Sequence, residues 1–380
     1  MQPISPLESW LVFLGAAAFG TLFTHWPEWL SHSDEPDESA GVHPVQGSSN
    51  TDDASETAED DQSAEATAEP VQSFLDEMLA QSRYAILLRP QLVENLTVEQ
   101  LDRTRKAFSD AMCLVPEGEV LVRPERPLTV DADGLQAGKT LHLDSYFLDR
   151  FPVTNAQYRH FVAAGGYENM AIWDREIWPA VLDFVDRSGH PGPRYWRDGK
   201  FSRGEGNQPV VGVSWYEAAA YARWVGKRLA TDAEWVKAAS WPVSIPGHPL
   251  LQRKYPWGES MDRSRANVWG SGPGRAVNVD EFAAGASVGG LQQLIGNVWE
   301  WTADALAIDQ SQLQPGDKTN LKTLRGGAFD TYFHNQATCH FQSADWAMAR
   351  KHNIGFRVAI SLSDLTPADG PSSSVAEDKA

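Results

Sequence analysis

The first long apolar run of the chain extends over residues 9–27, nineteen positions without a charged side chain. A helix of that length, rising about 1.5 Å per residue, spans about 28 Å and matches the hydrocarbon core of a bilayer. Trp10 at one end, with Trp26 and Trp29 at the other, would lie at the two membrane interfaces. The pattern predicts a single-pass membrane helix within residues 1–30. A cleaved signal peptide or a buried or interfacial helix is the alternative, although neither a basic n-region nor a small-x-small cleavage site is visible.

Polar residues dominate the next segment, residues 31–70, which holds twelve Asp and Glu, no Lys or Arg and no aromatic residue. Such a segment cannot bury enough apolar surface to offset the entropy of ordering it, and its like charges repel. We therefore expect an extended, disordered acidic linker here, and a second disordered tail over residues 362–380.

Helical spacing of apolar residues follows between positions 71 and 112. Thr97 and Gln100 form a capping box at the start of one helix, and Pro90 separates that helix from an earlier one near residues 72–88. The pattern predicts a helical hairpin over residues 71–112, preceding the main domain.

The main domain is expected over residues 113–361, where the elements become short and Trp, Gly and turn residues become frequent. Alternation of apolar and polar positions predicts strands within residues 113–123 and 139–154. Three helices are each predicted from a Ser/Thr-x-x-Glu/Gln capping box. The boxes are Thr154 with Gln157, Ser214 with Glu217, and Thr231 with Glu234. We therefore expect a loop-rich α+β domain with little regular secondary structure.

Composition and charge narrow the class of protein. The 380 residues are 42% hydrophobic, which is too apolar for a wholly disordered chain, and two Cys cannot build a disulfide scaffold. Sixteen Asp and Glu and no Lys or Arg precede Arg83, so most of the net charge of −19 belongs to the N-terminal part. The nearly neutral remainder has no basic stripe of the kind that phosphate neutralisation needs, so nucleic acid is not expected as a partner.

A series of motifs then identifies a family. GNVWEWTAD begins at Gly296, RGGAF at Arg325 and NIGFRVA at Asn353, after PVTNAQYRHF and QPVVGVSWYEAAAYARWVGKRLATDAEW in that order. Together they resemble the formylglycine-generating enzyme, or sulfatase-modifying factor, family over residues 111–361. The resemblance implies a variant of the C-type-lectin fold.

The chain departs from this family at the positions that the resemblance assigns to copper. Family members of that activity carry two cysteines shortly after the RGG motif, and copper(I) favours such soft thiolate ligands. The corresponding residues here are Thr331 and Gln336, so copper is not expected and no residue is assigned a catalytic role. Cys339 and Cys113 are expected to be small buried side chains, and whether they pair with each other is left open.

Histidines offer a second candidate chemistry, because another branch of the family adds a histidine-rich domain that holds non-heme iron. No His lies between His43 and His142, so the predicted helical hairpin cannot be that domain. The loops around the later motifs could instead form a ligand pocket or hold a metal, although isolated loop histidines are usually solvated. The candidate ligand-binding residues are Trp299, Arg325, Asp330, Tyr332, His334, His340 and Asp345, with His352 nearby.

Structural calcium is the ion that the resemblance implies most directly, since calcium accepts carbonyl and carboxylate oxygens. The positions that correspond to one site are Gln293, Gly296 and Val298 through their carbonyls and Glu300 through its carboxylate. A second site would use the carbonyls of Asn267 and Val268, but residues 269–279 supply no acid to complete it. The alternative for Glu300 is a carboxylate that satisfies a turn.

Two functions follow as hypotheses. The first is a membrane-tethered binding or accessory module for a protein or a small polar ligand. The second is a metal-dependent oxidase that acts on a thiol substrate. The resemblance places the domain outside the cytoplasm, although neither flank of the apolar run carries Lys or Arg to set its orientation.

Overall fold

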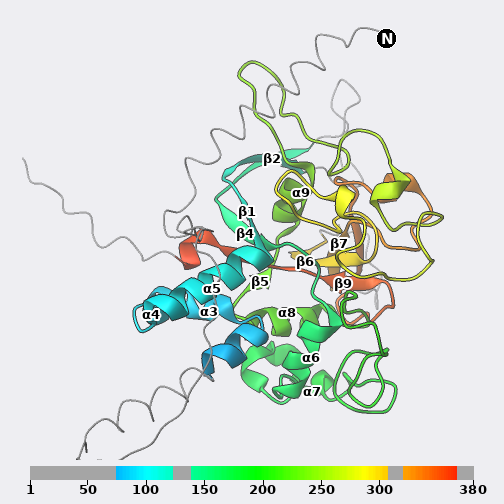
Figure 1. The fold of residues 1–380 in the computed structure, drawn as a ribbon. Helices are drawn as coiled ribbons and strands as arrows, with labels where there is room; N and C mark the ends of the chain where they lie inside the picture. Colours follow the sequence, from blue (N-terminus) through cyan, green and yellow to red (C-terminus); the bar gives the residue numbers. More distant parts are fainter. Residues whose placement is uncertain (1–73, 123–137, 307–319, 366–380) are drawn as a thin grey trace, which may run out of the picture. The chain divides into compact units, whose positions relative to one another are not determined.

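The computed structural model describes residues 74–122, 138–306 and 320–365 (Figure 1). The predicted membrane helix, the acidic linker and the tail beyond residue 365 lie outside these residues. Within the described ranges, no helix is both long enough and apolar enough to cross a membrane. The chain divides into two compact units, Met1–Glu77 and Met78–Ala380, and the following paragraphs concern the second.

Two four-stranded sheets and one hairpin carry the second unit. The first sheet is antiparallel throughout, and the second pairs β6 with β9 in parallel. The first sheet has the order β1 (Met112–Val115), β4 (Tyr146–Asp149), β10 (Val358–Ser361) and β5 (Arg228–Leu229). The second has the order β8 (Ser343–Trp346), β7 (Leu321–Arg325), β6 (Trp299–Ala305) and β9 (Ile354–Phe356), and the hairpin joins β2 (Gly118–Val122) to β3 (Lys139–Leu143).

The helices are short and lie around these strands, with α6, α7 and α8 together on one side and α9 on the other (Figure 1). They are α3 (Tyr84–Leu87), α4 (Pro90–Val93), α5 (Val98–Ala111), α6 (Asn155–Ala163), α7 (Trp178–Val181), α8 (Trp215–Trp224) and α9 (Asp232–Ser240). Single 3₁₀ turns are η3 (Met170–Ile172), η4 (Arg175–Ile177), η5 (Arg263–Arg265), η6 (Ala283–Gly285), η8 (His334–Gln336) and η9 (Leu362–Asp364). This mixture of helix and sheet confirms the α+β prediction.

Helix starts agree with the capping boxes. The side chains of the cap residues of α5, α6, α8 and α9 each accept a hydrogen bond from the backbone N–H three residues later, and the Gln or Glu there bonds back to the cap. Each box satisfies two backbone groups that a helix start would otherwise leave without partners. All four predicted boxes are confirmed.

Strand boundaries differ from the sequence prediction. The strand expected within residues 113–123 is two strands, because β1 pairs with β4 while β2 pairs with β3. Pro116 lies at the break and has no N–H to donate, and the N–H of Glu117 bonds to the hydroxyl of Ser145. The strand expected within residues 139–154 is divided in the same way into β3 and β4.

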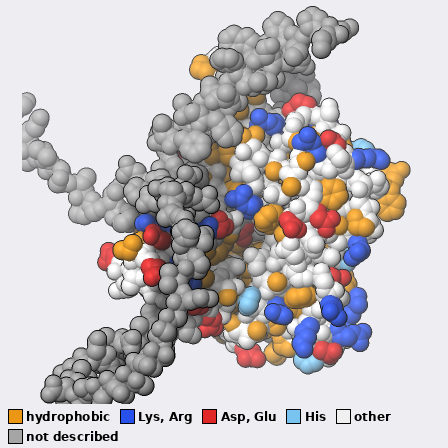
Figure 2. Space-filling model, in the orientation of Figure 1, with side chains coloured by type: hydrophobic (Ala, Val, Ile, Leu, Met, Phe, Trp, Pro, Cys, Tyr) orange, Lys and Arg blue, Asp and Glu red, His pale blue; other side chains and the backbone are white. Residues whose placement is uncertain are grey.

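Two apolar cores lie on either side of the central strands. The core around α6 and α8 is rich in aromatic side chains, with the rings of Tyr158 and Tyr221 stacked 5.3 Å apart. The core around α9 centres on Trp235 and Leu294. On the surface, Figure 2 shows charged side chains of both signs on one face, which agrees with the nearly neutral balance of this part of the chain.

Candidate functional site

The RGGAF motif forms the turn that leads from β7 into the candidate site. Gly326 and Gly327 have φ angles of 95° and 78°, in the region that favours glycine. A Cβ atom on Gly326 would lie 2.5 Å from the carbonyl oxygen of Leu294, so a side chain cannot be placed there without moving the backbone. The chain that follows the two glycines is buried at Ala328 and Phe329 and exposed at Tyr332 and Phe333.

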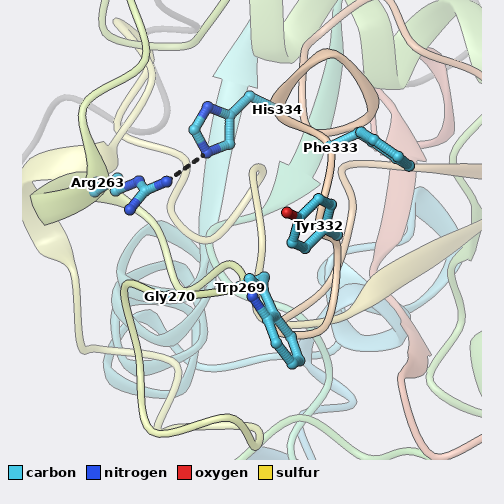
Figure 3. A pocket seen from close by; sticks show the side chains of 6 residues that line it. All are labelled: Arg263, Trp269, Gly270, Tyr332, Phe333 and His334. Carbon is cyan, nitrogen blue, oxygen red and sulfur yellow. Dashed lines mark hydrogen bonds between the residues drawn. The ribbon is translucent and has the colours of Figure 1, made fainter.

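A cavity of about 480 Å³ lies beside this loop, and we call it the aromatic cavity (Figure 3). Its lining residues are Arg263, Trp269, Gly270, Tyr332, Phe333 and His334. Three of these residues are aromatic and largely exposed: Trp269 is 55% exposed, Tyr332 64% and Phe333 60%. Exposed aromatic side chains gathered around one cavity are typical of a binding surface.

Contacts between two loops shape the aromatic cavity. The backbone N–H of Trp269 donates to the carbonyl of Thr331 at 3.3 Å, and the rings of Trp269 and Tyr332 lie 6.1 Å apart. Across the cavity, Nη2 of Arg263 lies 3.2 Å from Nε2 of His334 (Figure 3). A guanidinium can only donate, so Nε2 of His334 is the acceptor in this contact. The cavity thus combines stacking faces with one cation.

The structure brings together only some of the predicted ligand-binding residues. Tyr332 and His334 line the aromatic cavity, whereas Arg325 is completely buried and binds the carboxylate of Asp232. Asp330 faces another partner, because its carboxylate accepts from Nδ2 of Asn353. Three more predicted residues do not line the cavity. Trp299 contacts the ring of Phe341, and the carbonyl of His340 accepts from Arg325. Asp345 pairs with Lys351.

Arg263, Trp269 and Phe333 line the cavity but were not among the predicted site residues. Trp269 lies more than sixty positions before Tyr332 in the sequence, so no local pattern links the two. Phe333 could have been found from the sequence, because it directly follows Tyr332 in a loop that is otherwise polar. Contiguous exposed apolar side chains, such as this pair, are a sign of a binding surface.

The residues at the two copper positions do not supply thiolates. The hydroxyl of Thr331 accepts the N–H of Ala328 at 2.8 Å, and Gln336 ends the 3₁₀ turn η8. Cys339 is completely buried, and this burial raises the pKa of its thiol. Cys339 and Cys113 are both free, so they do not pair with each other. This donor set does not fit copper(I), which favours soft thiolates.

Glu300 already accepts three hydrogen bonds in the structure, from the side chains of Trp235 and Arg357. Its Oε2 accepts from Nε1 of Trp235 and from Nε of Arg357, each at 2.7 Å, and its Oε1 accepts from Nη2 of Arg357 at 2.6 Å. Glu300 and Arg357 are both almost fully buried, so the guanidinium neutralises the carboxylate inside the core. Glu300 lies in β6 and its partners are side chains, so the structure shows a buried ion pair and not the turn contact named as the alternative.

At the other residues of the predicted calcium sites, some oxygens are hydrogen-bonded and others are not. The carbonyl of Gly296 accepts from the N–H of Val298, and that of Asn267 accepts from the N–H of Asn297. The carbonyl of Val268 accepts from the hydroxyl of Ser271. Among the described residues, the buried side-chain oxygens of Asn267 and Gln293 lack a hydrogen-bond partner. Such amide oxygens fit a hard cation, whereas Glu300 in its present pairing does not. No cluster of three or more His, Cys, Asp or Glu suited to a metal occurs in the described part of the chain.

Comparison with known proteins places these features in a family. A family model for the sulfatase-modifying factor enzyme 1-like domain matches residues 97–362. The chain is 33% identical over 265 residues to the formylglycine-generating enzyme of Thermomonospora curvata, covering 60% of this chain and 85% of that protein. It is 30% identical over 287 residues to the inactive C-alpha-formylglycine-generating enzyme 2 of Mus musculus, covering 67% and 87%.

A third relative aligns with this chain over only half of its own length. The chain is 32% identical over 222 residues to the hercynine oxygenase of Mycobacterium tuberculosis, covering 54% of this chain and 50% of that protein. The chain therefore spans about half the length of the hercynine oxygenases that it matches. Since the family model extends over most of the described residues and agrees with the motifs, the chain belongs to the sulfatase-modifying factor enzyme 1-like family.

Proposed function

We propose that this protein is a binding or accessory module whose aromatic cavity takes a segment of a partner protein or a small polar ligand. The observation that carries the proposal is the convergence of three exposed aromatic side chains, Trp269, Tyr332 and Phe333, around one cavity. Aromatic faces supply stacking area, while Arg263 and His334 supply hydrogen-bond groups that orient a ligand.

The substitutions at the copper positions support binding rather than formylglycine chemistry. Thr331 and Gln336 offer a hydroxyl and an amide in place of thiolates, and the thiol of Cys339 is buried. One relative that aligns over two thirds of this chain is named as inactive. The second candidate function, a metal-dependent oxidase of a thiol, draws support from the relatives named formylglycine-generating enzyme and hercynine oxygenase. That function would need a different ligand set in this chain.

Substitution of the cavity aromatics is expected to weaken ligand binding at least tenfold, or about 1.4 kcal/mol. Full-length wild-type protein and the Tyr332→Ala and Phe333→Ala variants would be applied to the same array of random-sequence peptides. Peptides that bind the wild type should lose affinity for both variants. Leu182→Ala serves as the control, because Leu182 is 81% exposed but does not line the cavity.

Two results would contradict the binding proposal. One is equal binding by the wild type and both cavity variants. The other is conversion of a cysteine peptide to an aldehyde when the protein is incubated with copper, oxygen and a reductant, followed by mass spectrometry. Aldehyde formation would mean that a competent copper site exists and would favour the oxidase function.

A membrane tether through residues 9–27, with the domain outside the cytoplasm, is the remaining part of the proposal. The uncharged run is as long as a bilayer core is thick. After cell fractionation, the full-length protein is expected in the membrane pellet and released by detergent but not by high salt. A variant with Leu14→Arg and Phe19→Arg should move to the soluble fraction, since charges within the core oppose insertion. Intact wild-type protein in the detergent-free soluble fraction would refute the tether.

A further inference from the structure

A second, smaller cavity lies where α9 meets the β2–β3 hairpin, and it contains an amine. Its volume is about 140 Å³, and Lys237 of α9 is the one Lys or Arg that lines it. The apolar walls are Val115, Pro116, Trp241, Pro242 and Leu250. Trp241 caps α9 in a left-handed conformation, with φ of 43°, and both it and the following Pro242 line the cavity. Lys237 is only 4% exposed, so a reagent reaches its amine through this cavity.

Two backbone carbonyls hold the amine in one orientation. Nζ of Lys237 donates to the carbonyl of Gly118 at 3.0 Å and to that of Leu143 at 3.4 Å. Gly118 and Leu143 are cross-strand partners, so both acceptors belong to the same end of the hairpin. Two of the three positions on nitrogen are thus occupied, and the described residues supply no acceptor for the third. That position holds a proton in the ammonium form and a lone pair in the neutral form.

The surroundings of Lys237 favour the neutral amine. Burial lowers the pKa of the amine to about 8, although the carboxylates of Glu117, Asp144 and Glu234 act in the opposite direction. Near pH 7.5 roughly a quarter of the amine is then neutral, compared with about 0.1% for an ordinary lysine of pKa about 10.4. A desolvated, neutral lysine is a nucleophile for carbonyl carbon.

The charges at the rim indicate which carbonyl compounds fit. Glu117 and Glu119 line the cavity and are exposed at its edge. The two carboxylates repel an anionic ligand, and the apolar walls disfavour any charged ligand that leaves water, so a small uncharged one fits best.

We propose that Lys237 is an imine-forming site for small, uncharged aldehydes. The lone pair of Nζ attacks the carbonyl carbon, and a proton passes from nitrogen to oxygen to give a carbinolamine. Loss of one water molecule then leaves the C=N bond. No group is oxidised or reduced in this step, and it is independent of ligand binding in the aromatic cavity.

Reductive labelling tests the site. The full-length protein would be treated with limiting propanal and cyanoborohydride, and each lysine quantified by mass spectrometry. At pH 7.5 the initial labelling of Lys237 should exceed that of Lys106, whose side chain is 80% exposed, by at least tenfold. Labelling of Lys237 should rise with pH with a midpoint near 8. Labelling of Lys237 at or below the level of Lys106 would overturn the proposal.

Two variants separate the cavity from general reactivity. Lys237→Arg keeps a donor for the two carbonyls but cannot form the imine, so labelling at position 237 should vanish while that of Lys106 is unchanged. Leu250→Trp fills the cavity and should lower labelling of Lys237 at least tenfold without affecting Lys106. Melting curves confirm that both variants fold. Unchanged labelling of Lys237 in the Leu250→Trp variant would show that the cavity is not the route and would refute the site.

Discussion

Replacement of Glu300 by Gln is expected to lower the free energy of unfolding by about 3–5 kcal/mol. The substitution keeps the shape of the side chain but leaves the buried guanidinium of Arg357 without its counter-charge. An unpaired charge in the core costs far more than an exposed ion pair contributes. Urea unfolding of the full-length protein measures the loss, and Asp110→Asn at the exposed Lys106–Asp110 pair is the matched control, for which little change is expected.

Thermal unfolding of the wild type and the Glu300→Gln variant, with calcium and with chelator, tests whether calcium stabilises the domain. An ion that binds only the folded state adds about 2.7 kcal/mol at a hundredfold excess over its Kd, so we expect chelation to lower the melting temperature of the wild type. Because Glu300 is bound to Arg357, the Gln variant should be destabilised with calcium and with chelator alike. A destabilisation that disappears in chelator would make Glu300 an ion ligand instead. Wild-type melting curves that coincide in the two conditions would exclude calcium from the stability of the domain.

The Lys227→Met substitution is also expected to lower the free energy of unfolding by about 3–5 kcal/mol. Nζ of Lys227 lies 2.7 Å from Oδ1 of Asp149 and 2.7 Å from the hydroxyl of Tyr84, and 4.4 Å from the centre of the Tyr84 ring. The three residues come from α3, β4 and the chain that follows α8, so the ammonium joins the N-terminal helices to the first sheet. Met preserves the volume of the stem but leaves the buried carboxylate of Asp149 without its cation.

The stability that Lys227→Met removes should be smaller at low pH than at neutral pH. Burial raises the pKa of Asp149, and Lys227 is the main influence that lowers it again. Without Lys227 that pKa rises further above the unfolded value of about 3.9. A carboxyl with a raised folded-state pKa stabilises the fold when protonated, and this stability is lost as the pH rises. The variant should therefore lose less stability at pH 5 than at pH 7.

Two further variants check this interpretation. Tyr84→Phe keeps the ring over the ammonium and removes one hydrogen bond, so its effect should be about 1 kcal/mol. The double variant with Lys227→Met and Asp149→Leu should recover much of the loss, because no uncompensated charge is left in the core. Equal unfolding midpoints for the wild type and Lys227→Met would contradict the assignment.

Much of the fold could be predicted from local sequence. The four capping boxes are confirmed because each places its two partners three residues apart, so the hydrogen bonds form within one helical turn. The order of motifs predicted the family and the α+β class, which the family match and the described elements confirm. Strand ends were less predictable, since β1 and β2 are continuous in sequence but pair in different sheets.

The candidate site depended on contacts that no local pattern specifies. Glu300 was predicted as a calcium ligand from its motif, and its place beside Arg357 and Trp235 became visible only in the fold, where residues 57 and 65 positions away reach it. The aromatic cavity likewise needs Trp269 and Tyr332 on two separate loops, brought together by turns such as the one at Gly326. The sequence by itself determined the helix starts, the family and the absence of paired thiolates after the RGGAF motif, because these depend on residue identity and short spacing. Only the tertiary structure decided which buried charges neutralise each other and which aromatic side chains stay exposed, because desolvation and close packing depend on the neighbours that distant segments supply.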